Sequence, residues 1–156
     1  MRIINILLIG MLFINCTSQV KEATYTYELS SELKPYVFEY LATLENNDIE
    51  FKNQSFIVVF DASLVKTNLL GVAKGMFNND LVYVKINPRL WNWLTPKQKK
   101  HLIFHELSHD IFNITHTEEV ELMKPSMADP FKSFIMNIDK EIDLLMKHIK
   151  NEHGKI

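Results

Sequence analysis

Two histidines four residues apart, with a glutamate directly after the first, are the residues of this sequence best suited to chemistry. They are His105, Glu106 and His109, in the run His105-Glu106-Leu107-Ser108-His109. Side chains four residues apart lie on one face of an α-helix, so both imidazoles can reach the same metal ion. Zinc favours neutral imidazole nitrogen, and its catalytic sites keep one position for water. Glu106 adjoins the first ligand and can act on that water as a general base.

The helix that must carry these residues has a recognisable start. Thr95 can cap it, Pro96 suits the first helical position, and Gln98 stands where a capping box needs it. Apolar residues then occur on all sides of the helix, which predicts that it is largely buried. They are Leu102, Ile103, Phe104, Leu107, Ile111 and Phe112. Burying two histidines and a carboxylate without partners costs on the order of several kcal/mol, which favours a metal site.

The run His105-Glu106-Leu107-Ser108-His109 resembles the signature of the zincin metallopeptidases. The residues after it are similar to those of the metzincin branch, in which Gly-x-x-His follows the second histidine. Here Asn113-x-x-His116 stands in that place, one residue further on, which resembles a metzincin-like group of small bacterial lipoproteins. The resemblance covers about Leu69 to Pro125. It implies a zinc-dependent peptidase that acts on peptide or protein substrates.

The third zinc ligand is expected to come from chain that has left the helix. Asn113 is suited to the left-handed conformation that ends a helix, and three residues later His116 can turn back under the metal. Glu118 and Glu119 remain alternatives, because a carboxylate is the third ligand of other zincins, and Asp129 is a more remote candidate. The matching position favours His116.

Other polar and aromatic residues near the motif have weaker claims to a role. His101 lies one turn before His105 and is a further candidate ligand, but its lysine neighbours favour exposure. Asp110 can orient a ligand histidine or pair with a cation, and the sequence favours neither. Trp91 and Trp93 can rim a substrate cleft, although packing is the commoner role of tryptophan.

The resemblance also implies a methionine turn beneath the metal and a strand that pairs with substrate. Met123, within Glu121-Leu122-Met123-Lys124-Pro125, is the candidate for the turn, and Met127 is the second. Ordinary core packing is the alternative for both methionines. In the family the strand before the active-site helix binds extended substrate by edge pairing, a role that would fall on Leu81 to Ile86.

An N-terminal helix is predicted over Ser30 to Glu45 from its helical spacing of apolar residues. Ser30 or Ser31 can cap it. Pro35 is tolerated only in the first turn, which places the true start nearer Lys34.

The remaining elements predict an α+β domain with a small mixed β-sheet, a backing helix before it, the active-site helix and a C-terminal helix. Ser55 to Ala62 is apolar on successive residues, which predicts a central strand covered on both faces. Gly71 to Phe77 and Leu81 to Asn87 flank an Asn/Asp-rich turn and predict a hairpin, whose glycines allow a close approach. A long helix is predicted from an Asp129 cap through Ile149.

The N-terminus is typical of an exported bacterial lipoprotein. Ile3 to Ile14 is apolar but too short to span a bilayer comfortably, and Cys16 follows residues that resemble a lipobox. We therefore expect a signal peptide at 1–15, a lipidated Cys16 with a linker over 16–24, and the metallopeptidase-like domain at 25–156. The protein would be anchored in the cell envelope, facing the periplasm or the exterior. A free thiol in an ordinary signal or anchor is the alternative.

The overall composition limits the range of functions. The chain has 156 residues and 47% hydrophobic residues, which fits one globular domain, expected to be a monomer. A formal net charge of -2 speaks against nucleic acid as a partner. Two rivals to a peptidase remain, a hydrolase of another amide such as a cell-wall component, and a non-catalytic surface lipoprotein that binds zinc or a partner. The intact Glu106 argues against the latter.

Overall fold

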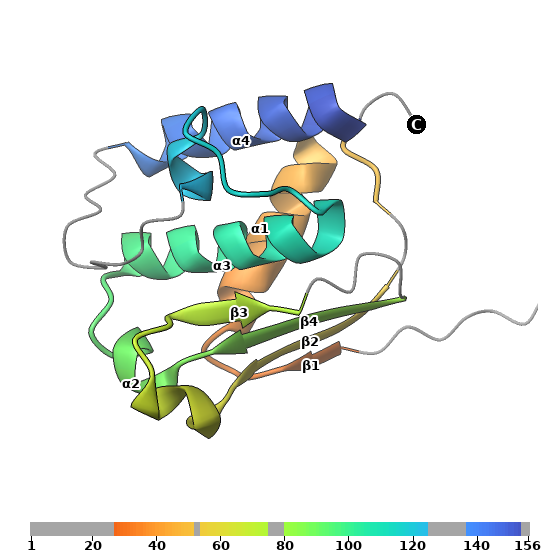
Figure 1. Cartoon of the computed structure of the whole chain (residues 1–156). Coiled ribbons are helices and arrows are strands. Elements are labelled where there is room, and N and C mark those ends of the chain that lie inside the picture. The colour runs from red at the N-terminus through yellow and green to blue at the C-terminus, as the bar shows by residue number, and fades with distance from the viewer. Residues whose placement is uncertain (1–26, 52–53, 75–79, 125–136, 154–156) are drawn as a thin grey trace, which may run out of the picture.

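The computed structural model describes residues 27–51, 54–74, 80–124 and 137–153. Within these residues the chain has the predicted α+β fold, a four-stranded mixed sheet with the long helices stacked on one of its faces (Figure 1). The expected signal peptide at 1–15, Cys16 and the linker at 16–24 lie outside the described residues. No helix in the described part is long and apolar enough to cross a membrane.

The sheet has the strand order β1-β2-β4-β3. Strands β1 and β4 run parallel to β2, and β3 runs antiparallel to β4, so the sheet is mixed as expected. The strands are β1 (Tyr27–Leu29), β2 (Ser55–Phe60), β3 (Gly71–Ala73) and β4 (Leu81–Ile86). The sequence did not predict β1, which is three residues long and gains its hydrogen bonds from β2 alone.

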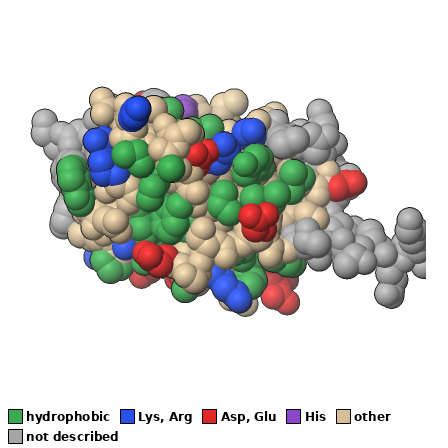
Figure 2. All heavy atoms as spheres, turned by 90° about the horizontal axis from the view of Figure 1, so that it is seen from below, with side chains coloured by type: hydrophobic (Ala, Val, Ile, Leu, Met, Phe, Trp, Pro, Cys, Tyr) green, Lys and Arg blue, Asp and Glu red, His purple; other side chains and the backbone are tan. Residues whose placement is uncertain are grey.

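Strand β2 is central, but only one of its faces is covered. Phe56 and Val58 are buried towards the helices, whereas Ile57 and Val59 are half-buried on the opposite face. The prediction of burial on both faces was wrong, because the long helices all lie on one side of the sheet. Figure 2 shows the other side, where hydrophobic side chains gather between charged ones.

The antiparallel pairing of the predicted hairpin is confirmed. Gly71 pairs with Ile86 and Ala73 with Val84 in an antiparallel register, while residues 75–79 between the strands lie outside the described residues. Strand β3 is therefore the edge of the sheet beside the predicted motif, and β4 lies between β2 and β3. The expectation that Leu81–Ile86 forms the substrate-pairing edge was wrong, since the hairpin places β3 outside it.

Helix α1 (Lys34–Asn46) begins where Pro35 predicts, but no serine caps it. Leu33 is the N-cap, without a side-chain hydrogen bond, and the Ser30 hydroxyl instead accepts a hydrogen bond from the Phe60 amide at 3.3 Å. Tyr40 connects this helix to the motif-bearing helix, because its hydroxyl lies 3.0 Å from Ser108 Oγ. Burial raises the pKa of Tyr40, so this hydroxyl stays protonated.

Helix α3 (Pro96–Phe112) carries the motif and is largely buried, as predicted. The capping box is present, since Gln98 Oε1 accepts from the Thr95 amide at 2.8 Å and Thr95 Oγ1 accepts from the Gln98 amide at 3.4 Å. A short helix, α2 (Pro88–Trp91), precedes it and is capped by the Asn87 side chain.

Helix α4 (Ile138–His153) is shorter than predicted. Asn137 is not helical, and its Oδ1 accepts a hydrogen bond from the Lys140 amide at 3.1 Å, as an N-cap does. The prediction of one continuous helix from Asp129 was wrong at this cap, while residues 129–136 lie outside the described residues. The apolar side of α4 packs on α3 and on η2 (Glu121–Met123), a single 3₁₀ turn.

Candidate metal centre

Three imidazoles converge on one point at the surface of α3. Nε2 of His105 lies 3.0 Å from Nε2 of His109 and 3.3 Å from Nε2 of His116. Nitrogens bound at about 2.0–2.1 Å to one tetrahedral metal ion are about 3.3 Å apart, so these spacings would let the imidazoles share an ion. The ligand atoms of all three histidines lie within 4.8 Å of one another.

The other nitrogen of each helical histidine is held by a main-chain carbonyl. His105 Nδ1 lies 2.6 Å from the Leu122 oxygen, and His109 Nδ1 bonds to the Ile114 oxygen. A carbonyl only accepts hydrogen bonds, so both Nδ1 atoms must carry the proton. This tautomer leaves the Nε2 lone pairs free, and a second hydrogen bond of this kind is usual for histidine ligands of metals.

The chain returns to the site because Asn113 ends α3 in the left-handed conformation, with φ 52° and ψ 31°. This is the reversal that the sequence predicted. The Ile114 carbonyl then faces His109, and the Thr117 amide donates to the Met123 oxygen at 3.0 Å. The loop that carries His116 is thus tied both to α3 and to η2.

The competing ligands are not brought to this point. Glu118 is exposed and pairs with Lys124 at 3.5 Å, and Glu119 is exposed as well. Asp129 lies outside the described residues. Within the described ranges, the group that could hold a metal therefore contains His116 and neither glutamate.

His101 is buried, with 4% of its surface exposed, so the expectation of an exposed side chain was wrong. Its Nε2 lies 3.2 Å from the Leu122 oxygen, the same atom that holds His105. The neighbouring lysines suggested exposure, but η2, which is distant in sequence, covers this side of the helix.

Burial keeps the helical histidines neutral. The pKa of His105 is lowered to about 3, chiefly by burial; the bond to Leu122 opposes this shift and the neighbouring imidazoles add to it. Burial likewise lowers the pKa of His109. Neutral imidazole is the form that binds a metal, so protons compete little with an ion at neutral pH.

Glu106 is buried at the base of β3, with 7% of its surface exposed. Its pKa is raised to about 7, chiefly by burial; the bond to the strand opposes this shift and the charge of Asp110 adds to it. Its Oε2 accepts a hydrogen bond from the Ala73 amide at 2.8 Å. Gly71 also lies against the carboxylate, since a Cβ at this position would be 2.7 Å from Glu106 Oε1. The close approach at Gly71 is thus made by the Glu106 side chain, and not by the backbone or ligand that was expected, while Gly75 lies outside the described residues. The Ala73 amide gave no sequence signal.

Asp110 fastens the helix to the sheet. Its Oδ2 accepts a hydrogen bond from the Tyr83 amide at 2.9 Å, and the residue is 1% exposed. Strand β3 ends at Ala73, opposite Val84, so Asp110 reaches the β4 main chain just beyond the end of β3. This contact sets the distance between α3 and the hairpin.

A cleft of about 820 Å³ opens over the three histidines. It is lined by residues 68–73, by residues 113–116, and by His105, Glu106 and His109. The tryptophans do not rim it. Trp91 is buried between the sheet and the helices, where it packs against Phe60, and Trp93 is exposed elsewhere.

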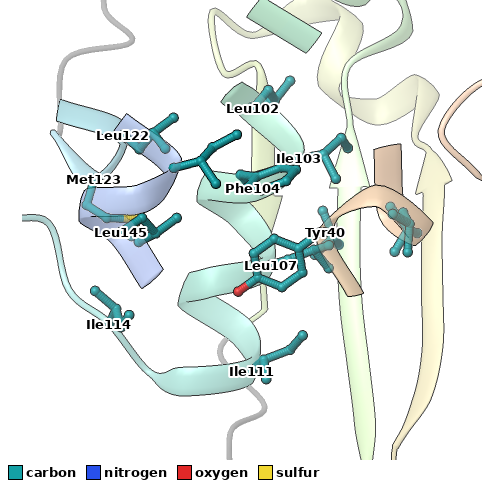
Figure 3. Close-up of a cluster of buried hydrophobic side chains, with 14 of the residues drawn as sticks. Tyr40, Leu102, Ile103, Phe104, Leu107, Ile111, Ile114, Leu122, Met123 and Leu145 are labelled. Atoms are coloured by element: carbon teal, nitrogen blue, oxygen red, sulfur yellow. The ribbon is translucent and has the colours of Figure 1, made fainter. Parts of the chain in front are cut away.

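Met123 is fully buried in η2 and lies with Leu122 beside Leu145 of α4 (Figure 3). The residue before it supplies the carbonyl that holds His105, so η2 lies directly against the site. Met127, the second candidate, falls outside the described residues. The assignment of Met123 to a methionine turn stays a prediction.

Comparison of the chain with protein-family models, with curated proteins and with solved structures found no match. The case for a metal centre therefore depends on the positions of its own atoms, above all the three Nε2 atoms and the two carbonyls that fix the tautomers.

Proposed function

We propose that the protein is a zinc-dependent metallohydrolase and that it hydrolyses peptide bonds. One observation carries the proposal, namely the convergence of the His105, His109 and His116 Nε2 atoms beside the buried carboxylate of Glu106. Three imidazole ligands and an adjacent base are the parts that hydrolysis by a metal-activated water requires.

Zinc is the proposed ion because of the donor set. Three imidazoles in near-tetrahedral spacing suit zinc, whereas magnesium and calcium require oxygen ligands that these residues do not supply. A zinc ion bound there would lower the pKa of a water molecule and polarise the scissile carbonyl.

Glu106 is the proposed general base. It directly follows His105 on the helix, lines the same cleft, and has its pKa raised to about 7 mainly by burial. A base is most effective when its pKa lies near the working pH, because it can then both take and return a proton. Glu106 would accept a proton from the attacking water and deliver it to the leaving amine.

A peptide substrate is supported by the edge of the sheet beside the cleft. The Leu70 carbonyl accepts from the Asn87 amide just after β4, and the Lys74 amide donates to Tyr83 of β4. The alternation of a strand therefore turns the main-chain groups of Gly71 and Ala73 away from β4. Both residues line the cleft. The Ala73 amide already donates to Glu106, so an extended peptide would pair with this edge through the main-chain groups of Gly71. Such pairing would place its main chain over the histidines.

The two rival functions differ in what they require. A hydrolase of another amide needs the same metal and base but no edge pairing, and a binding lipoprotein needs the metal without turnover. Anchoring at the cell envelope through Cys16 is compatible with all three, and we propose it on the resemblance of the N-terminus to lipoprotein signals.

The deciding experiment combines metal analysis with a digest of a peptide library. We expect about one zinc per chain, cleavage of peptides, and loss of cleavage with retained zinc in Glu106→Gln, because the amide keeps the shape but cannot take a proton. Glu118→Gln is the matched control, since Glu118 is exposed and pairs with Lys124 instead. Zinc without cleavage of any peptide would favour a rival function, and a chain that binds no zinc would overturn the proposal.

A further inference from the structure

We propose that strand β3 forms a seat for the base, in which the Ala73 amide and the bare Cα of Gly71 position the Glu106 carboxylate. The catalytic consequence of this seat rests on the proposed function, whereas its geometry does not. Ala73 and Gly71 would thus be positioning residues that act through Glu106.

The Ala73 amide is available because of its place in the strand. The next amide, that of Lys74, donates to the Tyr83 oxygen of β4 at 3.1 Å. Successive amides of a strand point in opposite directions, so the Ala73 amide points away from β4 at the open edge. It donates to Glu106 Oε2 at 2.8 Å. The edge of the sheet thereby holds one carboxylate oxygen.

Gly71 provides the space for the rest of the carboxylate. A Cβ at this position would lie 2.7 Å from Oε1 and 3.0 Å from both Cδ and Cγ of Glu106. Gly71 is paired with Ile86 within a strand, so the backbone conformation alone does not call for glycine. The absent side chain is therefore needed by Glu106, because any larger residue displaces its carboxyl group.

Together these contacts restrict a flexible side chain. A glutamate side chain loses the rotational freedom of several bonds when it is held in one conformation. The backbone of β3 supplies that restraint before substrate binds. The Ala73 amide is thus already in use and would not be available to a substrate strand paired to this edge.

The kinetic test adds a methyl group next to the Glu106 carboxylate, at Gly71, or removes the amide hydrogen-bond donor of Ala73. In Gly71→Ala and in Ala73→Pro we expect kcat on the best library peptide to fall by on the order of a hundredfold, with KM changed by less than about threefold. Zinc content should stay at the wild-type value. Val59→Ile is the control, because it adds one methyl group to the open face of the sheet. Wild-type kcat in Gly71→Ala would overturn the proposal.

The second test measures the seat without any substrate. Gly71→Ala should lower the unfolding temperature in the wild-type background and leave it nearly unchanged in the Glu106→Ala background, where the clash is absent. Equal losses in both backgrounds would overturn the geometry. A wild-type chain that cleaves no peptide would contradict the proposed function instead. The unfolding temperatures of the two single variants and the double variant would still decide whether Gly71 and Glu106 are coupled.

Discussion

His105 donates a hydrogen bond of 2.6 Å from Nδ1 to the main-chain oxygen of Leu122. The same oxygen accepts from His101 Nε2 at 3.2 Å, so two successive turns of α3 are fastened to one atom of η2. The orientation of a proposed zinc ligand therefore depends on a turn that is held from behind by α4 (Figure 3).

The first prediction concerns the third ligand. His116→Ala should weaken zinc affinity by orders of magnitude, because His116 Nε2 closes the group of three donors. Glu118→Ala and Glu119→Ala should leave the affinity nearly unchanged, since both side chains are exposed and outside the group. Titration against a competing chelator measures all three variants. The reverse ranking would indicate a glutamate ligand and would remove the basis for a methionine turn at Met123.

The second prediction concerns metal removal. Binding energy at a site made of α3 and its following loop is also folding energy, so a chelator should lower the unfolding temperature and zinc should restore it. Magnesium at the same concentration should not, because the site offers nitrogen donors alone. An unfolding temperature that is the same with and without chelator would contradict a tightly held zinc.

Local signals predicted much of this site. The capping box at Thr95, the four-residue spacing of the histidines and the left-handed Asn113 are each set by residues close in sequence. Their physical requirements are satisfied within one or two turns, so no knowledge of the fold is needed to recognise them.

The rest of the site depends on main-chain groups and on distant contacts. The Leu122 carbonyl and the Ala73 amide have no side-chain signature, and the fold alone brings them to His105 and Glu106. His101 was expected at the surface because its sequence neighbours are lysines, and η2 covers it.

The third prediction concerns pH and the metal-free protein. The pKa of His105 falls from 6.5 to about 3 on folding, so between these values the unfolded chain binds more protons and stability falls as pH falls. Glu106 acts in the opposite direction, since its pKa rises from 4.5 to about 7 and its contribution is lost as pH rises through that range. Denaturant unfolding of Glu106→Gln should therefore show a steeper loss of stability from pH 6.5 to 4.5 than the wild type. Parallel curves would contradict these opposed contributions.

The fourth prediction concerns the anchor. Cys16→Ser should move the protein from the membrane fraction to the soluble fraction, if acylation of this thiol is the anchor. Fractionation of cells that express each form, followed by detection of the domain, measures this. Unchanged partitioning would point to an uncleaved apolar N-terminus.

The last prediction concerns Asn113, whose conformation decides where two parts of the site lie. Its φ of 52° is costly for a residue with a branched side chain, by about 1–2 kcal/mol. Asn113→Gly should therefore keep both stability and zinc affinity, whereas Asn113→Val should lower both, because the Ile114 carbonyl then leaves His109 and the His116 loop shifts. Thr115→Val, at an exposed position in the same loop, is the control. Chemical unfolding and zinc titration of the three variants separate the two effects. Loss of stability in Asn113→Val with wild-type zinc affinity would mean that His116 reaches the metal by a path that does not depend on this reversal.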